Sequence, residues 1–219
     1  MEVTKFTGRA NINLYRGDCN VAMAGMRAGQ YDLAIVDPPY GIGYDGAKQT
    51  SGSHGGRKAH EFKGWDSKPP SKKYFDNIFR VSKNQIIWGA NYFTKYLPPS
   101  MGWIIWRKNR GNFSSSDAEL AFSSFNRALR EYTKNPLELI REGGTIHPTQ
   151  KLVCLYKWLL TNYAKQGDTI LDTHGGSMSI AVACWDLGFD LDLYELDADY
   201  YAAGVERVQR HVAQMQLEI

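Results

Sequence analysis

The segment from residue 169 to residue 195 most constrains the fold of this chain, because it predicts a strand, a helix and a second strand in close succession. Residues 169–171 and 189–194 are apolar runs of strand length, and residues 178–187 between them are expected to form a helix. Strands that alternate with helices in this way build α/β folds, with a mostly parallel sheet covered by helices on both faces. We therefore expect an α/β fold of this kind.

The rest of the chain continues the same alternation. Further strands are expected at residues 12–15, 32–36, 85–88, 102–106, 118–122 and 129–132. Further helices are expected at residues 20–27, 72–80 and 198–214, and another is expected to begin at Pro148, because proline suits the first helical position. A length of 219 residues suits one large domain, so residues 1–219 are predicted to form a single domain.

A second informative feature, Asp37-Pro38-Pro39-Tyr40, directly follows the strand predicted at residues 32–36. The prolines fix the backbone and leave rigid carbonyl acceptors, and the carboxylate of Asp37 accepts a further hydrogen bond. The ring of Tyr40 can stack on the face of a base. Together these groups suit a flat heterocycle that carries an exocyclic amine. The alternative is a turn that ends a strand, since proline also presets turn dihedrals.

A nucleoside-binding pattern follows the two strands of the segment at residues 169–195. Asp172 ends the first strand, Gly175-Gly176-Ser177 leads into the helix, and Glu195 ends the second strand. An acid at about this offset accepts hydrogen bonds from ribose hydroxyls in nucleotide-binding units. The pattern Gly-x-Gly-x-x-Gly and the phosphate loop are absent, which favours a cofactor without phosphates, such as S-adenosylmethionine. A tight connection between strand and helix is the alternative interpretation.

The order of these features carries a resemblance to a known family. Asp37-Pro38-Pro39-Tyr40 comes first, whereas the string His147-Pro148-Thr149-Gln150-Lys151 and the loop at residues 172–177 come near the end. The chain resembles the permuted (beta-type) DNA adenine-N6 methyltransferases, and residues 86–100 and 118–121 resemble small members from phages and prophages. The resemblance covers about residues 12–210. It implies a Rossmann-like, circularly permuted methyltransferase fold, and methyl transfer from S-adenosylmethionine to the N6 amine of a flipped adenine in double-stranded DNA.

The resemblance also implies roles for individual residues. Asp37, Pro38, Pro39 and Tyr40 would be catalytic, and the residues expected to bind the cofactor are Asp18, Cys19, Asp37, Lys151, Asp172, Gly176, Ser177 and Glu195. Two positions depart from the family pattern. Met178 follows Ser177 where a glycine is usual, which adds bulk near the cofactor loop, and Trp106-Arg107-Lys108 replaces the usual Trp-Asp-Lys. The chain also lacks an obvious large target-recognition domain.

Basic residues gather in two stretches that are candidates for DNA contact. Residues 41–73 are predicted to form a basic, mobile loop that faces DNA or recognises the target sequence. The candidate DNA-binding residues of this loop and of the second stretch are Lys58, Lys63, Lys68, Arg107, Lys108 and Arg110. A solvated surface face explains either stretch equally well, and the net charge is only +3. Tyr44 and Trp65 would contact flanking bases or pack beneath the loop.

Composition limits the remaining functions. No apolar stretch approaches the roughly 20 residues of a membrane span, no signal peptide is visible, and the three cysteines are widely spaced, so a cytoplasmic protein without a membrane or metal partner is expected. The family implies that a homodimer is an option. Two alternatives stay open: a DNA cytosine-N4 methyltransferase, whose motif more often begins with Ser, and a non-catalytic DNA-binding module whose cofactor loop has decayed at Met178.

Overall fold

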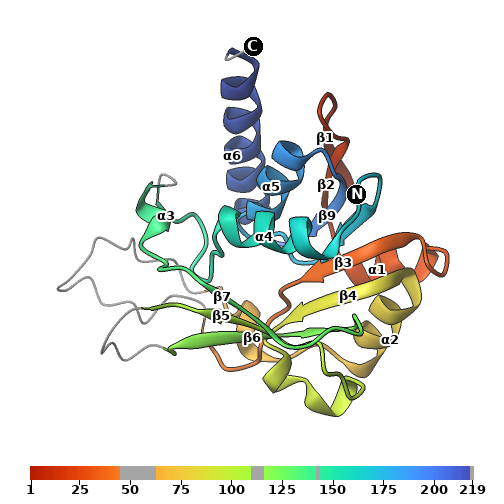
Figure 1. Ribbon diagram of the computed structural model, residues 1–219. Coiled ribbons are helices and arrows are strands. Elements are labelled where there is room, and N and C mark those ends of the chain that lie inside the picture. Colours follow the sequence, from red (N-terminus) through yellow and green to blue (C-terminus); the bar gives the residue numbers. More distant parts are fainter. Residues whose placement is uncertain (45–62, 110–115, 142–143, 218–219) are drawn as a thin grey trace.

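A computed structural model of the protein describes residues 1–44, 63–109, 116–141 and 144–217 (Figure 1). These residues contain a nine-stranded sheet with the strand order β1-β2-β9-β8-β3-β4-β6-β5-β7. The strands are β1 (Glu2–Phe6), β2 (Ile12–Arg16), β3 (Tyr31–Val36), β4 (Ser82–Trp88), β5 (Ile104–Arg107), β6 (Ala118–Ser123), β7 (Arg130–Thr133), β8 (Thr169–Asp172) and β9 (Asp190–Glu195). The helices are α1 (Cys19–Gly25), α2 (Lys72–Val81), α3 (Glu138–Arg141), α4 (Val153–Tyr163), α5 (Ser179–Leu187) and α6 (Ala198–Leu217).

The sheet is mostly parallel, as predicted. The neighbouring strands β2, β9, β8, β3 and β4 all run in the same direction. Two strands run the other way: β1 is antiparallel to β2, and β6 is antiparallel to both β4 and β5. From the central β8–β3 pair, β8 leads to β9 on one side and β3 leads to β4 on the other. Ligands bind beyond the carboxyl ends of the strands at such a switch point.

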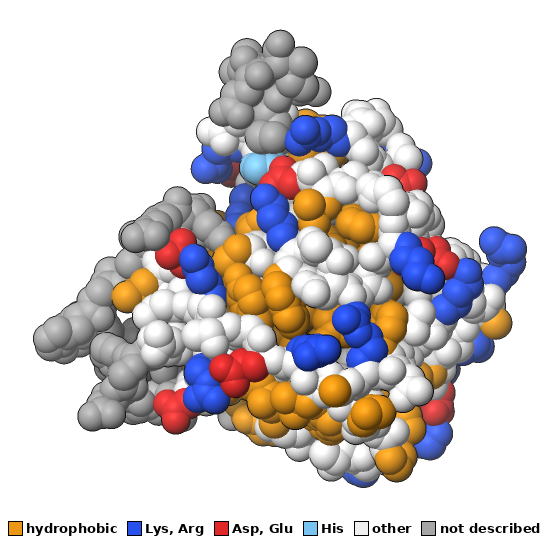
Figure 2. Space-filling view, in the orientation of Figure 1, with side chains coloured by type: hydrophobic (Ala, Val, Ile, Leu, Met, Phe, Trp, Pro, Cys, Tyr) orange, Lys and Arg blue, Asp and Glu red, His pale blue; other side chains and the backbone are white. Residues whose placement is uncertain are grey.

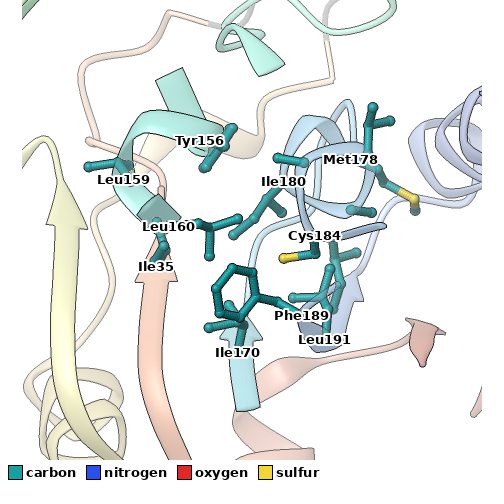
Figure 3. Packing of buried hydrophobic residues seen from close by; sticks show 14 of the residues in the cluster. Ile35, Tyr156, Leu159, Leu160, Ile170, Met178, Ile180, Cys184, Phe189 and Leu191 are labelled. Atoms are coloured by element: carbon teal, nitrogen blue, oxygen red, sulfur yellow. The ribbon is translucent and has the colours of Figure 1, made fainter. Parts of the chain in front are cut away.

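Helices cover both faces of the sheet. The helices α4, α5 and α6 pack together on one face, whereas α1 and α2 lie on the other (Figure 1). Figure 3 shows Ile35 of β3 and Ile170 of β8 beside Leu160 of α4, in the cluster on the first face. Val36, one residue after Ile35, belongs to a second cluster with Ile78 of α2. The central strands are therefore apolar on both faces, as is usual for parallel sheets.

The helix expected from Pro148 begins at Val153 instead, after the N-cap residue Leu152. Residues 147–150 form a turn, in which the backbone N–H of Gln150 donates to the carbonyl of His147. The carbonyl of Lys151 accepts a hydrogen bond from Oγ of Ser179 (2.8 Å). The prediction was wrong because a proline permits a helix to start but does not require it. The hydrogen bond between Lys151 and Ser179 keeps residue 151 outside the helix.

The other strands and helices agree with the sequence within a few residues, except that neither β1 nor the short helix α3 was expected. The edge strand β1 was not expected, because its five residues, EVTKF, mix polar and apolar side chains and pair only with β2. Among the described helices, none is both long and apolar enough to cross a membrane.

Candidate active site

The loops that the sequence singled out meet at the switch point of the sheet. Strands β3 and β8 are hydrogen-bonded neighbours, so the loop that begins at Asp37 lies beside the loop that begins at Asp172. Glu195 ends β9, and Asp18 follows β2. A cavity of about 700 Å³ opens at this edge, and its walls include Asp18, Cys19, Asp37, Lys151, Gly176, Ser177 and Glu195. The predicted cofactor residues are thus brought together, with Asp172 buried immediately behind them.

Glu195 ties the ends of two loops together at one side of the cavity. Its Oε2 accepts a hydrogen bond from the backbone N–H of Gly176 (2.7 Å), and its Oε1 accepts one from the N–H of Asp197 (2.8 Å). Burial raises the pKa of this carboxyl. Because a carboxylate has about four acceptor sites, Glu195 can also accept a hydrogen bond from a hydroxyl of a ligand.

Asp18, which caps α1, lies beside Glu195, because β2 and β9 are paired and the N–H of Gly17 donates to the carbonyl of Glu195 (2.9 Å). Oδ1 of Asp18 accepts a hydrogen bond from the N–H of Asn20 (2.8 Å). Cys19 is buried beside it, and burial raises the pKa of its thiol to about 12. The thiol therefore stays protonated and contributes surface to the cavity rather than a nucleophile.

Two titratable groups lie at the end of β8: Asp172 is buried, and His174 is half-buried and lines the cavity. Burial raises the pKa of Asp172 to about 7, although the backbone N–H of His174 donates to its Oδ1 (3.0 Å). Burial also lowers the pKa of His174 to about 4. Both groups therefore favour their neutral forms more than they would in water.

The cavity fits S-adenosylmethionine in size and chemistry. Its volume lies within the range of about 300–1,000 Å³ that holds small organic ligands. Glu195 has acceptors for ribose hydroxyls, Asp18 also lines the cavity, and the backbone at Gly176 and Ser177 borders the cavity between β8 and α5. These residues could hold the cofactor.

Asp37 stands in the wall between this cavity and a second, smaller pocket. The second pocket has a volume of about 30 Å³ and is lined by Pro38, Pro39 and Tyr40 as well as by Asp37 itself. Such a volume holds about two water molecules, so a nucleobase requires this pocket to widen. All four predicted catalytic residues therefore line one small pocket, and two of them also face the large cavity.

The ring of Tyr40 is held in place from several sides. Its hydroxyl donates to Oδ1 of Asp37 (2.8 Å), and the ring stacks on Tyr92 with centroids 5.1 Å apart. It lies so close to Gly89 that a Cβ atom at position 89 would overlap it. Only glycine leaves this space, and Gly89 also adopts a φ of 68°, which favours glycine.

The residues after Tyr40 are anchored by Asp66, which the sequence did not single out. Its carboxylate accepts hydrogen bonds from the backbone N–H groups of Gly41 (2.7 Å), Ile42 (3.3 Å) and Tyr44 (2.8 Å). Asp66 lies within the loop predicted at residues 41–73, where it was counted only as an acid among basic residues. Both ends of this loop are thereby joined at the small pocket.

The side chain of Lys151 contacts the loop that begins at Asp37. Its Nζ donates to Oδ2 of Asp37 (2.5 Å) and lies 3.1 Å from Oε2 of Glu119. Although burial opposes the charged form, the carboxylates of Asp37 and Glu119 raise the pKa of this ammonium group. Glu119 itself was missed as a site residue. Its only signal was an acid near the start of a strand whose later residues, LAFS, are largely apolar.

The candidate DNA-binding residues have different surroundings. Lys63 is bound to Asp197 (2.7 Å) and Asp199 (2.6 Å) at the cavity, and Lys108 is buried and bound to Glu119 (2.7 Å). Acidic partners therefore already hold the charges of these two residues, and their contact with DNA stays a prediction.

The remaining candidates divide into exposed and undescribed residues. Lys68 is exposed, and Arg107 is exposed but bound to Glu131 (2.8 Å). On the face seen in Figure 2, Lys and Arg side chains are scattered among the described residues rather than gathered in one patch. Lys58 and Arg110 lie outside the described residues, as does most of the loop predicted at residues 41–73.

Comparisons with known proteins agree with this architecture. No family model matches the chain. The chain is 25% identical over 231 aligned positions to the type II methyltransferase M.HpaI of Haemophilus parainfluenzae, and the match covers 85% of this chain and 71% of the relative.

Two solved structures show a similar fold. The complex of M1.HpyAVI with S-adenosylmethionine superposes with a TM-score of 0.58 at 20% identity, covering 90% of this chain and 98% of the other. The cytosine-N4-specific PvuII DNA methyltransferase superposes with a TM-score of 0.58 at 10% identity, covering 93% and 91%. This protein therefore has the fold of the DNA methyltransferases that use S-adenosylmethionine.

Proposed function

We propose that this protein is a DNA methyltransferase that transfers a methyl group from S-adenosylmethionine to the exocyclic N6 amine of an adenine flipped out of double-stranded DNA. The observation that carries the proposal is the position of Asp37, which borders both the cofactor-sized cavity and the small pocket of Pro38, Pro39 and Tyr40. A target amine in the small pocket would face a methyl donor in the large cavity.

In this mechanism, the chain supplies hydrogen-bond acceptors at the reacting nitrogen. The lone pair of an adenine amine is delocalised into the ring, and hydrogen bonds from the amine to the Asp37 carboxylate and the Pro38 carbonyl favour a tetrahedral nitrogen. Bound S-adenosylmethionine supplies an electrophilic methyl group. Positive charge develops on the nitrogen during transfer, and fixed acceptors stabilise it. The methylated ammonium is strongly acidic, so Asp37 need not be a strong base.

The hydrogen bonds that Asp37 already makes leave room for this role. Each of its oxygens accepts one hydrogen bond, from Tyr40 or from Lys151, and a carboxylate can accept about four. The target base must leave the duplex, because its amine is otherwise unreachable. Stacking on the Tyr40 ring would replace part of the lost base stacking, about 1–3 kcal/mol.

Cytosine-N4 methylation is the second candidate, because PvuII, a cytosine-N4-specific enzyme, superposes as well as M1.HpyAVI does. We favour adenine because this chain has Asp37 at the first motif position. A non-catalytic module is supported least, since the Met178 side chain is fully buried and does not line the cavity.

Transfer of tritium from labelled S-adenosylmethionine to DNA distinguishes the three functions. Label in N6-methyladenine supports the proposal, label in N4-methylcytosine supports the second candidate, and no label at saturating cofactor supports the third. Asp37→Ala should abolish transfer without unfolding the protein, as judged by circular dichroism, and Asp76→Asn on the exposed surface of α2 is the matched control. Methylation by Asp37→Ala would refute the assignment of Asp37.

The DNA contacts and the homodimer are also part of the proposal. Lys68 is exposed beside the small pocket, where its neighbour Pro69 approaches Gly41, and we assign it to DNA phosphates together with Lys58 and Arg110. Light scattering of the free protein tests the dimer, and a monomer mass at working concentration would contradict it.

A further inference from the structure

Four charged side chains of alternating sign lead away from the reacting end of the proposed site. Lys151 lies between Asp37 (2.5 Å) and Glu119 (3.1 Å), and Glu119 in turn lies 2.7 Å from Nζ of Lys108. The side chain of Lys151 is only 2% exposed. The arrangement contains two acids and two amines, so its formal charge sums to zero.

We propose that Glu119 is a positioning residue of the methyl-transfer site, which acts through Lys151 by holding its ammonium group against the Asp37 carboxylate. Glu119 itself does not line either pocket, so it has no direct contact with a bound base or cofactor. This inference rests on the proposed function, because it takes Asp37 to be the residue that accepts a hydrogen bond from the amine during methylation.

The direction of β6 explains how Glu119 reaches this place. Glu119 is the second residue of β6, which is antiparallel to β4. The start of an antiparallel strand lies at the edge where parallel strands end, which here is the edge of Asp37. Lys108 comes directly after β5, the other neighbour of β6. The sheet therefore places Asp37, Glu119 and Lys108 at the same edge, and the segment before α4 brings Lys151 to them.

The second acid, Glu119, affects whether the buried pair of Asp37 and Lys151 keeps its charges. A lone buried pair can lose its charges by transfer of the proton from the ammonium to the carboxylate, since burial penalises both ions. A second carboxylate on Lys151 makes that loss unfavourable, because opposite charges at about 3 Å attract strongly where water is excluded. Glu119 therefore holds the proton on Lys151, although burial and the charge of Glu119 also raise the pKa of Asp37.

Other titratable groups face this pair from the surrounding elements. They are Tyr40 after β3, Tyr74 of α2, Glu119 of β6, Tyr156 of α4 and Asp172 of β8. Lys108 after β5 faces Glu119. Burial opposes ionisation of Glu119, but the ammonium groups of Lys151 and Lys108 lower its pKa to about 2. Glu119 is therefore an anion throughout the working pH range, and its charge can be removed cleanly by substitution.

Two substitutions that remove charges of opposite sign test the inference. Glu119→Gln removes an anion, so both Asp37 and Lys151 lose protons more easily. Both limbs of the pH profile of the single-turnover methylation rate should therefore move to lower pH by about one to two pH units. Lys108→Met removes a cation and should move both limbs to higher pH. The double variant should return the limbs to near their original positions.

Controls separate this effect from damage to the fold. Glu206→Gln removes an acid from an exposed ion pair on α6 and should leave the profile in place, and thermal unfolding of each variant reports its stability. A purely structural role for Glu119 would lower the active fraction but leave the limbs where they are. Unmoved limbs, or limbs moved in the same direction by both substitutions, would overturn the inference.

The inference and the proposed function can fail separately. If the wild-type protein methylates no DNA, the proposed function fails. The inference is then judged from the carboxyl carbon signal of Asp37 in protein labelled with carbon-13 aspartate, assigned by comparison with Asp37→Asn. Its titration should move to lower pH in Glu119→Gln and to higher pH in Lys108→Met, and a titration unchanged in both variants would refute the inference.

Discussion

The side chain of Met178 packs against the backbone of helix α6 at Gly204, where an added Cβ atom would lie 2.7 Å from both Cγ and Sδ of Met178. Met178 is fully buried, belongs to the core cluster shown in Figure 3, and adopts a φ of 56°. The sequence suggested that Met178 crowds the cofactor loop. The structure instead turns its bulk into the core, where the missing side chain of residue 204 makes room for it.

Gly204→Ala should therefore destabilise the protein by about 1–3 kcal/mol, because the added methyl group overpacks a filled core. Gly25→Ala is the matched control, since a Cβ atom at this other helical glycine meets nothing within 4 Å. Urea unfolding measures the free energy of unfolding of both variants.

Met178→Gly should leave the affinity for S-adenosylmethionine within about twofold in calorimetry, because the side chain does not line the cavity. A large gain in affinity would show that Met178 obstructs the site.

The buried carboxyl of Asp172 predicts a pH dependence of stability. Burial raises its pKa from 3.8 to about 7 in the folded protein. The folded state therefore holds this proton more tightly than the unfolded state, and the stabilisation is complete below about pH 4 and is lost as the pH rises through 7. Asp172→Asn keeps the shape without the charge. Its free energy of unfolding should exceed that of the wild type by about 1–4 kcal/mol at pH 8 but not at pH 4. An equal difference at both pH values would contradict the shifted pKa.

Lys63 and Lys68 should have separable effects, although both were expected to bind DNA. Lys63 joins the loop before α2 to Asp197 and Asp199 beside Glu195, so Lys63→Met should weaken the binding of S-adenosylmethionine about threefold to tenfold. Lys68 is exposed, so Lys68→Met should remove about one phosphate contact. The slope of the logarithm of DNA affinity against the logarithm of salt concentration should become shallower by about one. Calorimetry and fluorescence anisotropy measure the two quantities. The opposite pattern would assign Lys63 to DNA and Lys68 to the cofactor.

Local patterns were sufficient to predict the central strands and the residues at their ends. The apolar runs of β3, β8 and β9 are followed by Asp37, Asp172 and Glu195, and parallel strands bring their carboxyl ends to one edge of the sheet. Residues that end neighbouring parallel strands therefore lie near one another at that edge. This reasoning required no knowledge of side-chain contacts.

The partners of Asp37 depend instead on the tertiary structure. Lys151 comes from an extended segment where proline predicted a helix, and Glu119 comes from β6, whose antiparallel direction is set by its pairing with β4 and β5. Neither feature has a local signal, because strand direction depends on the path of the whole chain. The composition and spacing of the sequence thus determined which residues end the strands. The packing of distant segments decided which buried charges meet Asp37, since electrostatic attraction acts over distances in space and not along the chain.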